Sequence, residues 1–436
     1  MRSLLYLLPL VFATAVSGQT TRTLPPDSRF LVPLPASGSE QQIVRYAKHG
    51  KIKDALLIAA MEASPQAVWL TGGTPSEMIT TVVPVMHRAA FQHAVPVFVL
   101  YNIPGRDCGS YSAGGAQDTA TYEAWVRSIA TAIGDQKAVV LLEPDALANL
   151  PSDCGYPSTV NSAQLTSDRY TQLNGAVDLL EAQPQTLVYL DGGNSLWRAV
   201  GDMAERLATA GVSRAQGFFS NVSNFRPSNY ETHFDTWVSE CLAFASNSTE
   251  GGWRLGHYNW CASQYYSPDG TVNPNNIATW TYTDQWYASS LGSAVPATHF
   301  VVDTSRNGQG SLDASVYATT PFDQPAAVVQ TLSNGSWCNP PGRGLGTRST
   351  AKTNVPLLDA YLWVKTPGQS DGTCDAAGGA RAWDYAAFSL PGWPTDPNAQ
   401  SLFDPLWGVA DPAAGSWFPQ QALELAKKAN PPLLTF

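Results

Sequence analysis

The chain has 436 residues, which is enough for one large α/β domain or two smaller ones. Hydrophobic residues make up 44% of it, so a complete core is available and extensive disorder is not expected. The formal net charge is −10, only 14% of the residues are charged and no basic stripe is present, which argues against a nucleic-acid partner.

Residues 1–18 have the features of a secretory signal peptide: Arg2, an apolar stretch over 4–16, and the small residues Ser17 and Gly18. The stretch is too short for a convincing membrane span, and no later run of that kind follows it. We therefore expect a secreted, extracellular protein with no membrane partner. Residues 19–40 contain Pro and Ser with little periodicity, which predicts an extended N-terminal leader on the domain surface.

Because disulfides form in the oxidising environment outside the cell, the six cysteines of a secreted protein predict three disulfides. About fifteen pairings are possible. The cysteines are Cys108, Cys154, Cys241, Cys261, Cys338 and Cys374. A metal site is the alternative, but the chain has no Cys-x-x-Cys and its His residues are scattered, so no metal is expected. Asn247 and Asn334 stand in sequences typical of glycosylation sites, and Asn221 matches too but is a candidate for burial.

Strand-like and helix-like segments alternate along the chain. Short apolar runs predict strands at residues 67–70, 97–101, 138–142, 186–190, 216–220, 300–302 and 358–365. Helical spacing predicts helices over residues 41–63 (divided near Gly50), 76–94, 119–133, 165–182, 194–210 and 418–429. This alternation favours a parallel sheet with right-handed crossovers.

Two segments interrupt the alternation. Residues 251–292 are rich in Trp, Tyr and Asn and predict a long insertion over one face, which a disulfide from Cys241 to Cys261 would pin. Residues 378–417 are similar in character. No repeat and no low-complexity linker occurs, so no tethered binding module is expected.

Residues 138–142 form an unbroken apolar run, which is typical of a strand covered on both faces. Pro144 ends this strand because proline cannot donate to a sheet ladder, and Glu143 and Asp145 then stand at its end. One of them could simply cap the turn that begins at Ala146. Taken alone, this explanation is about as good as a catalytic one.

The same pattern recurs after other predicted strands, which also run into loops that contain Gly or Pro and an acidic residue. These acids are Asp107, Asp191, Asp303 and Asp371. Parallel α/β sheets and barrels place their chemistry at the carboxyl ends of the strands. We therefore interpret the carboxylates as one site on a common rim.

The chemistry that such a rim supports is general acid–base catalysis. The chain has no metal-ligand set, Ser–His pair or phosphate loop, and no cofactor is expected. Its 14 Trp and 17 Tyr residues fit either core packing or stacking platforms for sugar rings, which composition alone does not separate. Carboxylates, abundant aromatics and export together point to glycoside hydrolysis.

Several short segments, each weakly specific alone, occur in one characteristic order. They are Tyr101-Asn-Ile-Pro-Gly-Arg-Asp-Cys108, Glu143-Pro-Asp-Ala-Leu-Ala-Asn-Leu150, Asp191-Gly-Gly, Ser220-Asn-Val-Ser-Asn224, Val302-Asp-Thr-Ser-Arg-Asn-Gly308, Ser336-Trp-Cys-Asn339, and Trp363-Val-Lys365 with Ser370-Asp-Gly372. Together they resemble the glycoside hydrolase family 6 cellulases across nearly all of the predicted mature chain.

The resemblance implies a distorted parallel β/α barrel of about seven strands, with a tunnel or cleft, as a single catalytic domain over residues 41–436. It also implies inverting hydrolysis of β-1,4-glucan, so the expected partners are cellulose or other β-1,4-glucan chains. We expect a monomer.

The resemblance also implies roles for particular residues. Asp145 matches the proton donor, Asp107 the aspartate that helps to hold the donor's proton, and Asp371 the proposed base. Arg106 is expected to hold the aspartate beside it. The matching substrate-binding positions are Trp69, Tyr101, Arg106, Asp191, Asn194, Trp197, Asn224, Trp337, Lys365 and Gln369. The family's two disulfides correspond to Cys108–Cys154 and Cys338–Cys374, and Cys241–Cys261 is an addition.

Three positions depart from the pattern of this family. Asn194 replaces a usual His, Gln369 replaces a common Glu, and Ala113 replaces a Ser that often helps to hold the catalytic water, with Ser112 as a substitute. These changes affect the expected rate and subsite preference, not the identity of the acid.

Endo and exo cleavage are separate possibilities within this family. Asn102, Gly105, the loop after Ser305 and the short spacing from Asp371 to Cys374 favour an endoglucanase. The long insertion and the Trp-rich C-terminal segment could instead cover the site. The alternatives are a cellobiohydrolase of the same family and a non-hydrolytic glucan-binding protein.

Overall fold

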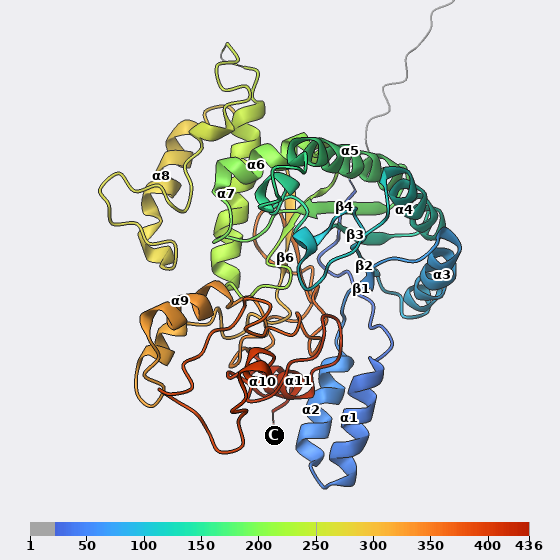
Figure 1. Ribbon diagram of the computed structural model, residues 1–436. Helices are drawn as coiled ribbons and strands as arrows, with labels where there is room; N and C mark the ends of the chain where they lie inside the picture. Colours follow the sequence, from blue (N-terminus) through green and yellow to red (C-terminus); the bar gives the residue numbers. More distant parts are fainter. Residues whose placement is uncertain (1–21, 250, 436) are drawn as a thin grey trace, which may run out of the picture.

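The protein contains one seven-stranded parallel sheet in which the strands follow one another in chain order (Figure 1). The computed structural model describes residues 22–249 and 251–435. The strands are β1 (Val68–Leu70), β2 (Val97–Leu100), β3 (Ala138–Leu142), β4 (Thr186–Asp191), β5 (Gly217–Ser220), β6 (His299–Asp303) and β7 (Leu358–Leu362). Each predicted strand coincides with or overlaps one of these, so the predicted parallel α/β architecture is confirmed.

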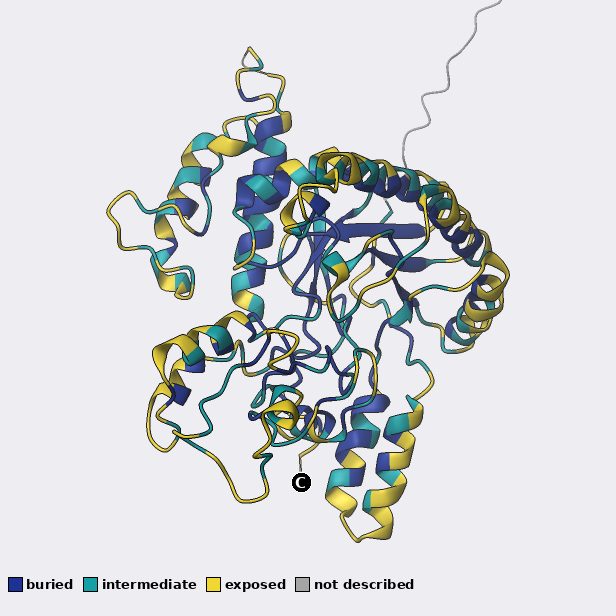
Figure 2. Cartoon of the chain, in the orientation of Figure 1, coloured by how far each residue is buried: buried dark blue, intermediate teal, exposed yellow. Residues whose placement is uncertain are grey.

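The sheet is buried on both faces, which explains the continuous apolar runs of its central strands. Val99, Leu141 and Tyr189 belong to a core cluster on the inner face, whereas Phe98 and Val140 belong to the cluster packed against the surrounding helices. Figure 2 shows the strands as a buried centre within a ring of partly exposed helices.

The sheet curls until its two edges almost meet. The N–H of Ala67, just before β1, donates to the carbonyl of Trp363, just after β7, at 2.9 Å. The indole of Trp69 donates to the carbonyl of Val364 at 2.8 Å. No ladder joins β1 to β7 in the described sheet, so the predicted distorted barrel is a curled, incompletely closed one.

Helices form the outer layer, and α3 to α7 lie in an arc around the sheet (Figure 1). Thr74 accepts a hydrogen bond from the Glu77 N–H at the start of α3, and Asp118 does the same for Thr121 in α4. The helices are α1 (Ser37–Lys48), α2 (Ile52–Glu62), α3 (Pro75–Phe91), α4 (Thr119–Ile133), α5 (Ser162–Glu181), α6 (Val200–Thr209), α7 (Ser228–Ser246), α8 (Thr281–Ser290), α9 (Ala326–Asn334), α10 (Pro397–Ser401) and α11 (Pro419–Lys427).

The N-terminal leader differs from the prediction in two ways. Its last residues are helical, because α1 begins at Ser37. Leu24 and Phe30 are also buried in the inner-face cluster rather than lying on the surface, and Phe30 forms a parallel bridge with Val95. A curled sheet leaves an apolar interior that its own side chains must share with other segments, and the leader supplies two of them. The predicted signal peptide lies outside the described residues.

The helix predicted over residues 194–210 begins only at Val200. The Asn194 side-chain oxygen accepts a hydrogen bond from the Leu196 N–H at 3.0 Å. The main-chain carbonyl of Asn194 accepts one from the Trp197 N–H. An Asn side chain that binds local backbone in this way competes with helix formation. Residues 194–199 therefore form a turn at the end of β4.

Four of the described helices have no counterpart among the predicted ones: α7, α8, α9 and α10. In α7 the signal was present, because Phe234, Trp237, Val238 and Cys241 have helical spacing and are buried. The predicted insertion over residues 251–292 includes α8 and lies beside α7, outside the ring of sheet and helices (Figure 1).

The three predicted disulfides are all confirmed: Cys108–Cys154, Cys241–Cys261 and Cys338–Cys374. Among the possible glycosylation sites, Asn221 is fully buried and donates to two backbone carbonyls, as its suspected burial implied. Asn334 is exposed and Asn247 is partly so, and their glycosylation remains a prediction. In the described part of the chain, no helix is both long and apolar enough to cross a membrane.

Candidate active site

A cavity of about 650 Å³ lies among the loops that follow the strands. Of the sequence-predicted site residues, the cavity is lined by Trp69, Tyr101, Asp107, Asp145, Asn194, Trp197, Asn224, Trp337, Lys365 and Asp371. The structure therefore brings together all three predicted catalytic carboxylates. Arg106, Asp191 and Gln369 do not line the cavity.

Three of the other strand-end acids are committed to main-chain N–H groups. Glu143 is fully buried and accepts hydrogen bonds from the N–H groups of Asn102 and Ile103 at 2.8 and 2.9 Å. Burial raises the pKa of Glu143 to about 7 against the opposing effect of these bonds. Of the two acids that flank Pro144, Glu143 is therefore the one that stabilises the backbone, and Asp145 is the one that reaches the cavity.

Asp191 supports the loop that carries Asp145. One of its carboxylate oxygens accepts from the N–H groups of Leu147 and Ala148 at 3.0 and 2.8 Å, and the other accepts from Gly193. Asp191 is therefore a positioning residue within the protein, and its contact with substrate stays a prediction.

Asp303 has the same kind of role at the other side of the sheet. Its carboxylate accepts from the N–H groups of Ser305, Val364 and Lys365 at 2.8, 3.1 and 3.0 Å. It thereby joins the loop after β6 to the segment that follows β7 and fixes the backbone of Lys365 beside the cavity.

Asp145 is held on strained backbone at the end of β3. Its φ is 68° and that of Glu143 is 55°, values in the left-handed region that only a well-supported loop retains for such residues. Burial raises the pKa of Asp145 well above its usual value, and the nearby charges of Asp191 and Asp107 raise it further. The charge of Lys365 opposes this shift, but within the described residues no cation forms an ion pair with Asp145, and the net shift favours the protonated form of its carboxyl group.

Asp107 lies beside the Cys108–Cys154 disulfide and also has a positive φ of 57°. It accepts a hydrogen bond from the Ser112 N–H at 2.6 Å. Burial raises the pKa of Asp107 in spite of this bond and of the charge of Arg106.

The expectation that Arg106 holds Asp107 directly is wrong. The Arg106 guanidinium instead donates to the carbonyls of Ser112 and Thr71 and lies 4.7 Å from the centre of the Tyr101 ring. It influences Asp107 only through its charge and holds the two loops on either side of Tyr101 together.

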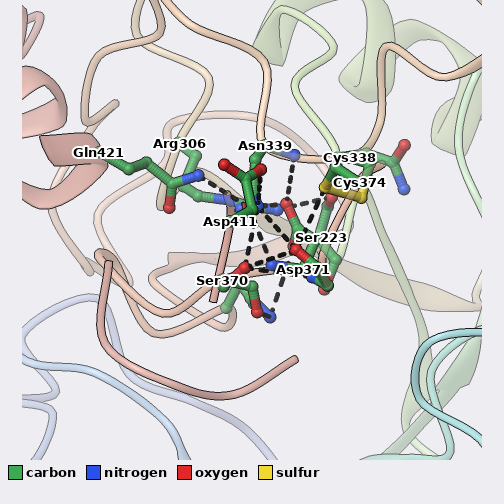
Figure 3. A network of polar contacts seen from close by, with 12 residues as sticks. Ser223, Arg306, Cys338, Asn339, Ser370, Asp371, Cys374, Asp411 and Gln421 are labelled. Atoms are coloured by element: carbon green, nitrogen blue, oxygen red, sulfur yellow. Dashed lines mark hydrogen bonds and ion pairs between the residues drawn. A yellow bond between two sulfur atoms is a disulfide. The ribbon is translucent and has the colours of Figure 1, made fainter. Parts of the chain in front are cut away.

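Asp371 is held by two cations, of which Arg306 is labelled in Figure 3. Its Oδ2 accepts from Arg306 Nη1 at 2.8 Å and from the Asn339 N–H at 3.0 Å, while its Oδ1 lies 3.4 Å from Lys365 Nζ. Burial alone would raise the pKa of Asp371, but the charges of Arg306 and Lys365 outweigh it and hold the pKa below its usual value. The pKa values of Asp371 and Asp145 are therefore shifted in opposite directions.

Asn339 orients Asp371 through a buried network (Figure 3). Its side-chain oxygen accepts from the Asp371 N–H and from Gln421, both at 2.9 Å, and its side-chain nitrogen donates to Ser370 and Asp411. Neither Asn339 nor Arg306 was predicted as a site residue. Both stand in family-like motifs, but their partner Asp371 lies 32 and 65 residues away from them along the chain.

The aromatic residues serve both of the purposes considered for them. Trp125 and Trp237 are buried in the core, whereas Trp197 and Trp337 are 36% and 40% exposed and line the cavity. Trp69 packs edge to face against Tyr101 at 5.6 Å between ring centres. The cavity is thus flanked by aromatic faces on which the flat, apolar face of a ligand ring can stack.

The three positions that depart from the family pattern differ in whether they reach the cavity. Asn194 lines the cavity, while Gln369 lies outside it. Ser112 lines the cavity and Ala113 does not, which agrees with the proposed substitution of one for the other. Further lining residues that were not predicted come from the segment at the end of α9, Ser333, Asn334 and Ser336.

A curled α/β barrel whose strand ends present one carboxyl group with a raised pKa and one with a lowered pKa, in a cavity flanked by tryptophans, defines the class of acid–base glycoside hydrolases. The family model described as "Glycosyl hydrolases family 6" matches residues 27–429. The chain belongs to this family, as its sequence motifs indicated.

Known proteins of both cleavage types are similar to the chain. It is 30% identical to Endoglucanase 1 of Streptomyces halstedii over 87% of this chain and 92% of that protein. It is 28% identical to Exoglucanase 2 of Hypocrea jecorina over 77% of this chain and 60% of that protein. The structure of the endoglucanase Cel6 from Mycobacterium tuberculosis, in complex with a methyl-cellobiosyl-4-deoxy-4-thio-β-D-cellobioside, is 28% identical with a TM-score of 0.59 and covers 92% of this chain and 97% of that chain.

Replacing Asp303 should destabilise the protein. Asp303→Ala leaves three buried N–H groups without their acceptor, so we expect the free energy of unfolding to fall by about 3 kcal/mol in denaturant titrations. Asp313→Ala is the matched control, because Asp313 is exposed and caps a short helical turn, and its loss should cost about 1 kcal/mol or less. Equal losses for the two variants would contradict the role assigned to Asp303.

Replacing Asp107 should change the pH dependence of activity. Asp107→Asn removes a negative charge that raises the pKa of Asp145. Because the pKa of Asp145 should then fall, its proton is lost at lower pH, and the alkaline limb of the kcat/KM profile should move to lower pH. Asp135→Asn removes an equal charge from an exposed loop and should leave that limb in place. An unmoved limb in Asp107→Asn would show that the two carboxyl groups are not coupled.

Proposed function

We propose that this protein is a secreted, inverting β-1,4-glucanase that cleaves cellulose chains internally. The observation that carries the proposal is the pair of carboxyl groups in one cavity whose pKa values are shifted in opposite directions, upward for Asp145 and downward for Asp371. Membership of family 6 supports hydrolysis of β-1,4-glucan as the reaction.

In this proposal Asp145 is the general acid. It gives its proton to the glycosidic oxygen as the bond to the sugar ring breaks, and the raised pKa keeps that proton available at neutral pH. Asp107 shares the negative surroundings that retain the proton, and Asp191 holds the backbone on which Asp145 stands.

Asp371 acts at the opposite side of the reacting sugar. Its Oδ2 is occupied by Arg306 and Asn339, whereas within the described residues its Oδ1 has only the ion pair with Lys365 at 3.4 Å. Oδ1 is therefore the atom that can accept a proton from the attacking water. Its negative charge also stabilises the positive charge that develops on the sugar ring in the transition state.

The remaining cavity residues suit an uncharged sugar chain. Trp69, Trp197 and Trp337 supply stacking surfaces, and Asn194 and Asn224 supply polar groups. The related proteins are named as an endoglucanase and an exoglucanase, and the Mycobacterium tuberculosis enzyme was solved with a cellobiose-based ligand, which supports a cellulose-type substrate.

Internal cleavage is supported by what does not reach the cavity. Within the described residues, no lining side chain comes from the 251–292 insertion or from the 378–417 segment, the two parts that could have covered the site. Asp371 is also only three residues from Cys374 in a short disulfide loop. The second candidate is a cellobiohydrolase, which the similarity to Exoglucanase 2 keeps in consideration.

Secretion is supported by the signal-like residues 1–18, which the structure does not describe, and by three disulfides. The monomeric state remains a prediction. A non-hydrolytic glucan-binding role is disfavoured, because all three carboxylates are present in the cavity.

Removing the acid should abolish most turnover without abolishing binding. Asp145→Ala should lower the rate of reducing-sugar release from cello-oligosaccharides by about 100- to 10,000-fold, while affinity measured by calorimetry is retained. Dinitrophenyl cellobioside should lose much less activity, because its leaving group needs no proton. Asp168→Asn on α5 changes a carboxyl group outside the cavity and is the control. A variant that keeps more than a few per cent of the glucan activity would refute Asp145 as the acid.

Internal cleavage should show in the viscosity of carboxymethylcellulose. We expect the wild-type protein to lower viscosity rapidly while few reducing ends have formed, because each internal cut shortens a chain strongly. Slow release of cellobiose with little change in viscosity would favour the cellobiohydrolase alternative instead. Product sizes over time, measured by chromatography, provide an independent check.

A further inference from the structure

The 251–292 insertion is attached to the rim of the cavity at a specific place. Gln264 is fully buried, and its side-chain nitrogen donates to the carbonyls of Ser195 and Arg198 at 3.1 and 2.8 Å. These two carbonyls bracket Leu196 and Trp197, which both line the cavity. The insertion is therefore docked on the turn that presents Trp197.

A second attachment reaches another cavity loop. The Arg226 guanidinium donates to the side-chain oxygen of Asn275 at 2.9 Å and to the carbonyl of Pro274 at 3.0 Å, both in the insertion, and to Ser195 at 3.0 Å. Arg226 follows closely after Asn224, another lining residue. With the Cys241–Cys261 disulfide at its base, the insertion is held in one position relative to the cavity.

Tyr265 is the residue that this arrangement leaves exposed at the rim. Its hydroxyl donates to the Leu196 carbonyl at 3.1 Å, yet the residue remains 43% exposed, and Leu196 itself is 41% exposed. An exposed aromatic ring that is tied at its polar end costs little conformational entropy when it binds a ligand. Tyr265 thus continues the aromatic and apolar surface of Trp197 and Leu196 outward from the cavity.

We propose that Tyr265 forms an additional glucan-binding subsite, supplied by the insertion, where a β-1,4-glucan chain leaves the cavity past Trp197. The proposal rests on the proposed glucanase function. The ligand follows from continuity with the cavity: a chain bound against Trp197 meets the Tyr265 ring next. The nearby Arg226 is buried and its donors are engaged by the protein, which suits a neutral sugar better than an anionic ligand.

The test compares a short and a long substrate. Tyr265→Ala should raise KM for cellohexaose by about 3- to 10-fold and leave the kinetics on cellotetraose nearly unchanged, because only the longer chain reaches the ring. Tyr265→Phe keeps the ring and should stay close to wild type on both substrates. Tyr282→Ala is the matched control, since Tyr282 is in the same insertion, donates a hydrogen bond to Asp269 and does not line the cavity.

Each outcome bears on a different claim. Equal KM values for wild type and Tyr265→Ala on cellohexaose would overturn the subsite, and so would equal losses on both substrates, which would indicate a structural defect. Absence of hydrolysis by the wild type would refute the glucanase function itself. In that case calorimetry of cellohexaose and cellotetraose binding to the same variants still decides the subsite, because unchanged affinity of Tyr265→Ala for the longer chain would overturn it.

Discussion

The site depends on the hydrogen bonds that buried carboxylates accept from main-chain N–H groups at the ends of the strands. Loops that leave a parallel sheet carry N–H groups without ladder partners, and burying them unsatisfied would be costly. Glu143, Asp191 and Asp303 supply the missing acceptors for the loops after β2, β3 and β7. Because these loops are fixed, Asp145 can be held in a strained conformation with its carboxyl group at the cavity.

The division of labour between the cavity carboxylates follows from where cations lie. Burial disfavours the charged form of both Asp145 and Asp371. Within the described residues only Asp371 forms ion pairs with Arg306 and Lys365, and these hold its pKa low. Asp145 feels the charge of Lys365 without such a pair, and its burial and its negative neighbours raise its pKa. Two chemically identical side chains thus acquire pKa shifts of opposite direction, which is what acid-catalysed displacement by water requires.

The barrel and the insertion contribute differently to the cavity. The strands and the segments that follow them supply the carboxylates and the three tryptophans. The insertion supplies no lining residue within the described chain, but its buried Gln264 fixes the turn that presents Trp197. A segment added outside the barrel can therefore change the length of the glucan chain that the protein binds, without altering the acid or its proton.

The sequence by itself determined the strands, most of the sheet's covering helices and the positions of Asp107, Asp145 and Asp371, because apolar runs, Pro144 and the quoted motifs are local signals. The strand-end pattern alone did not separate Glu143 from Asp145, which are two residues apart, and the resemblance of the motif assigned Asp145 as the acid. Only the tertiary structure showed that Glu143 and Asp191 bind backbone N–H groups, and only it brought Arg306 and Asn339 to Asp371. Those contacts join segments 65 and 32 residues apart, and no periodicity within either segment encodes the partner in the other.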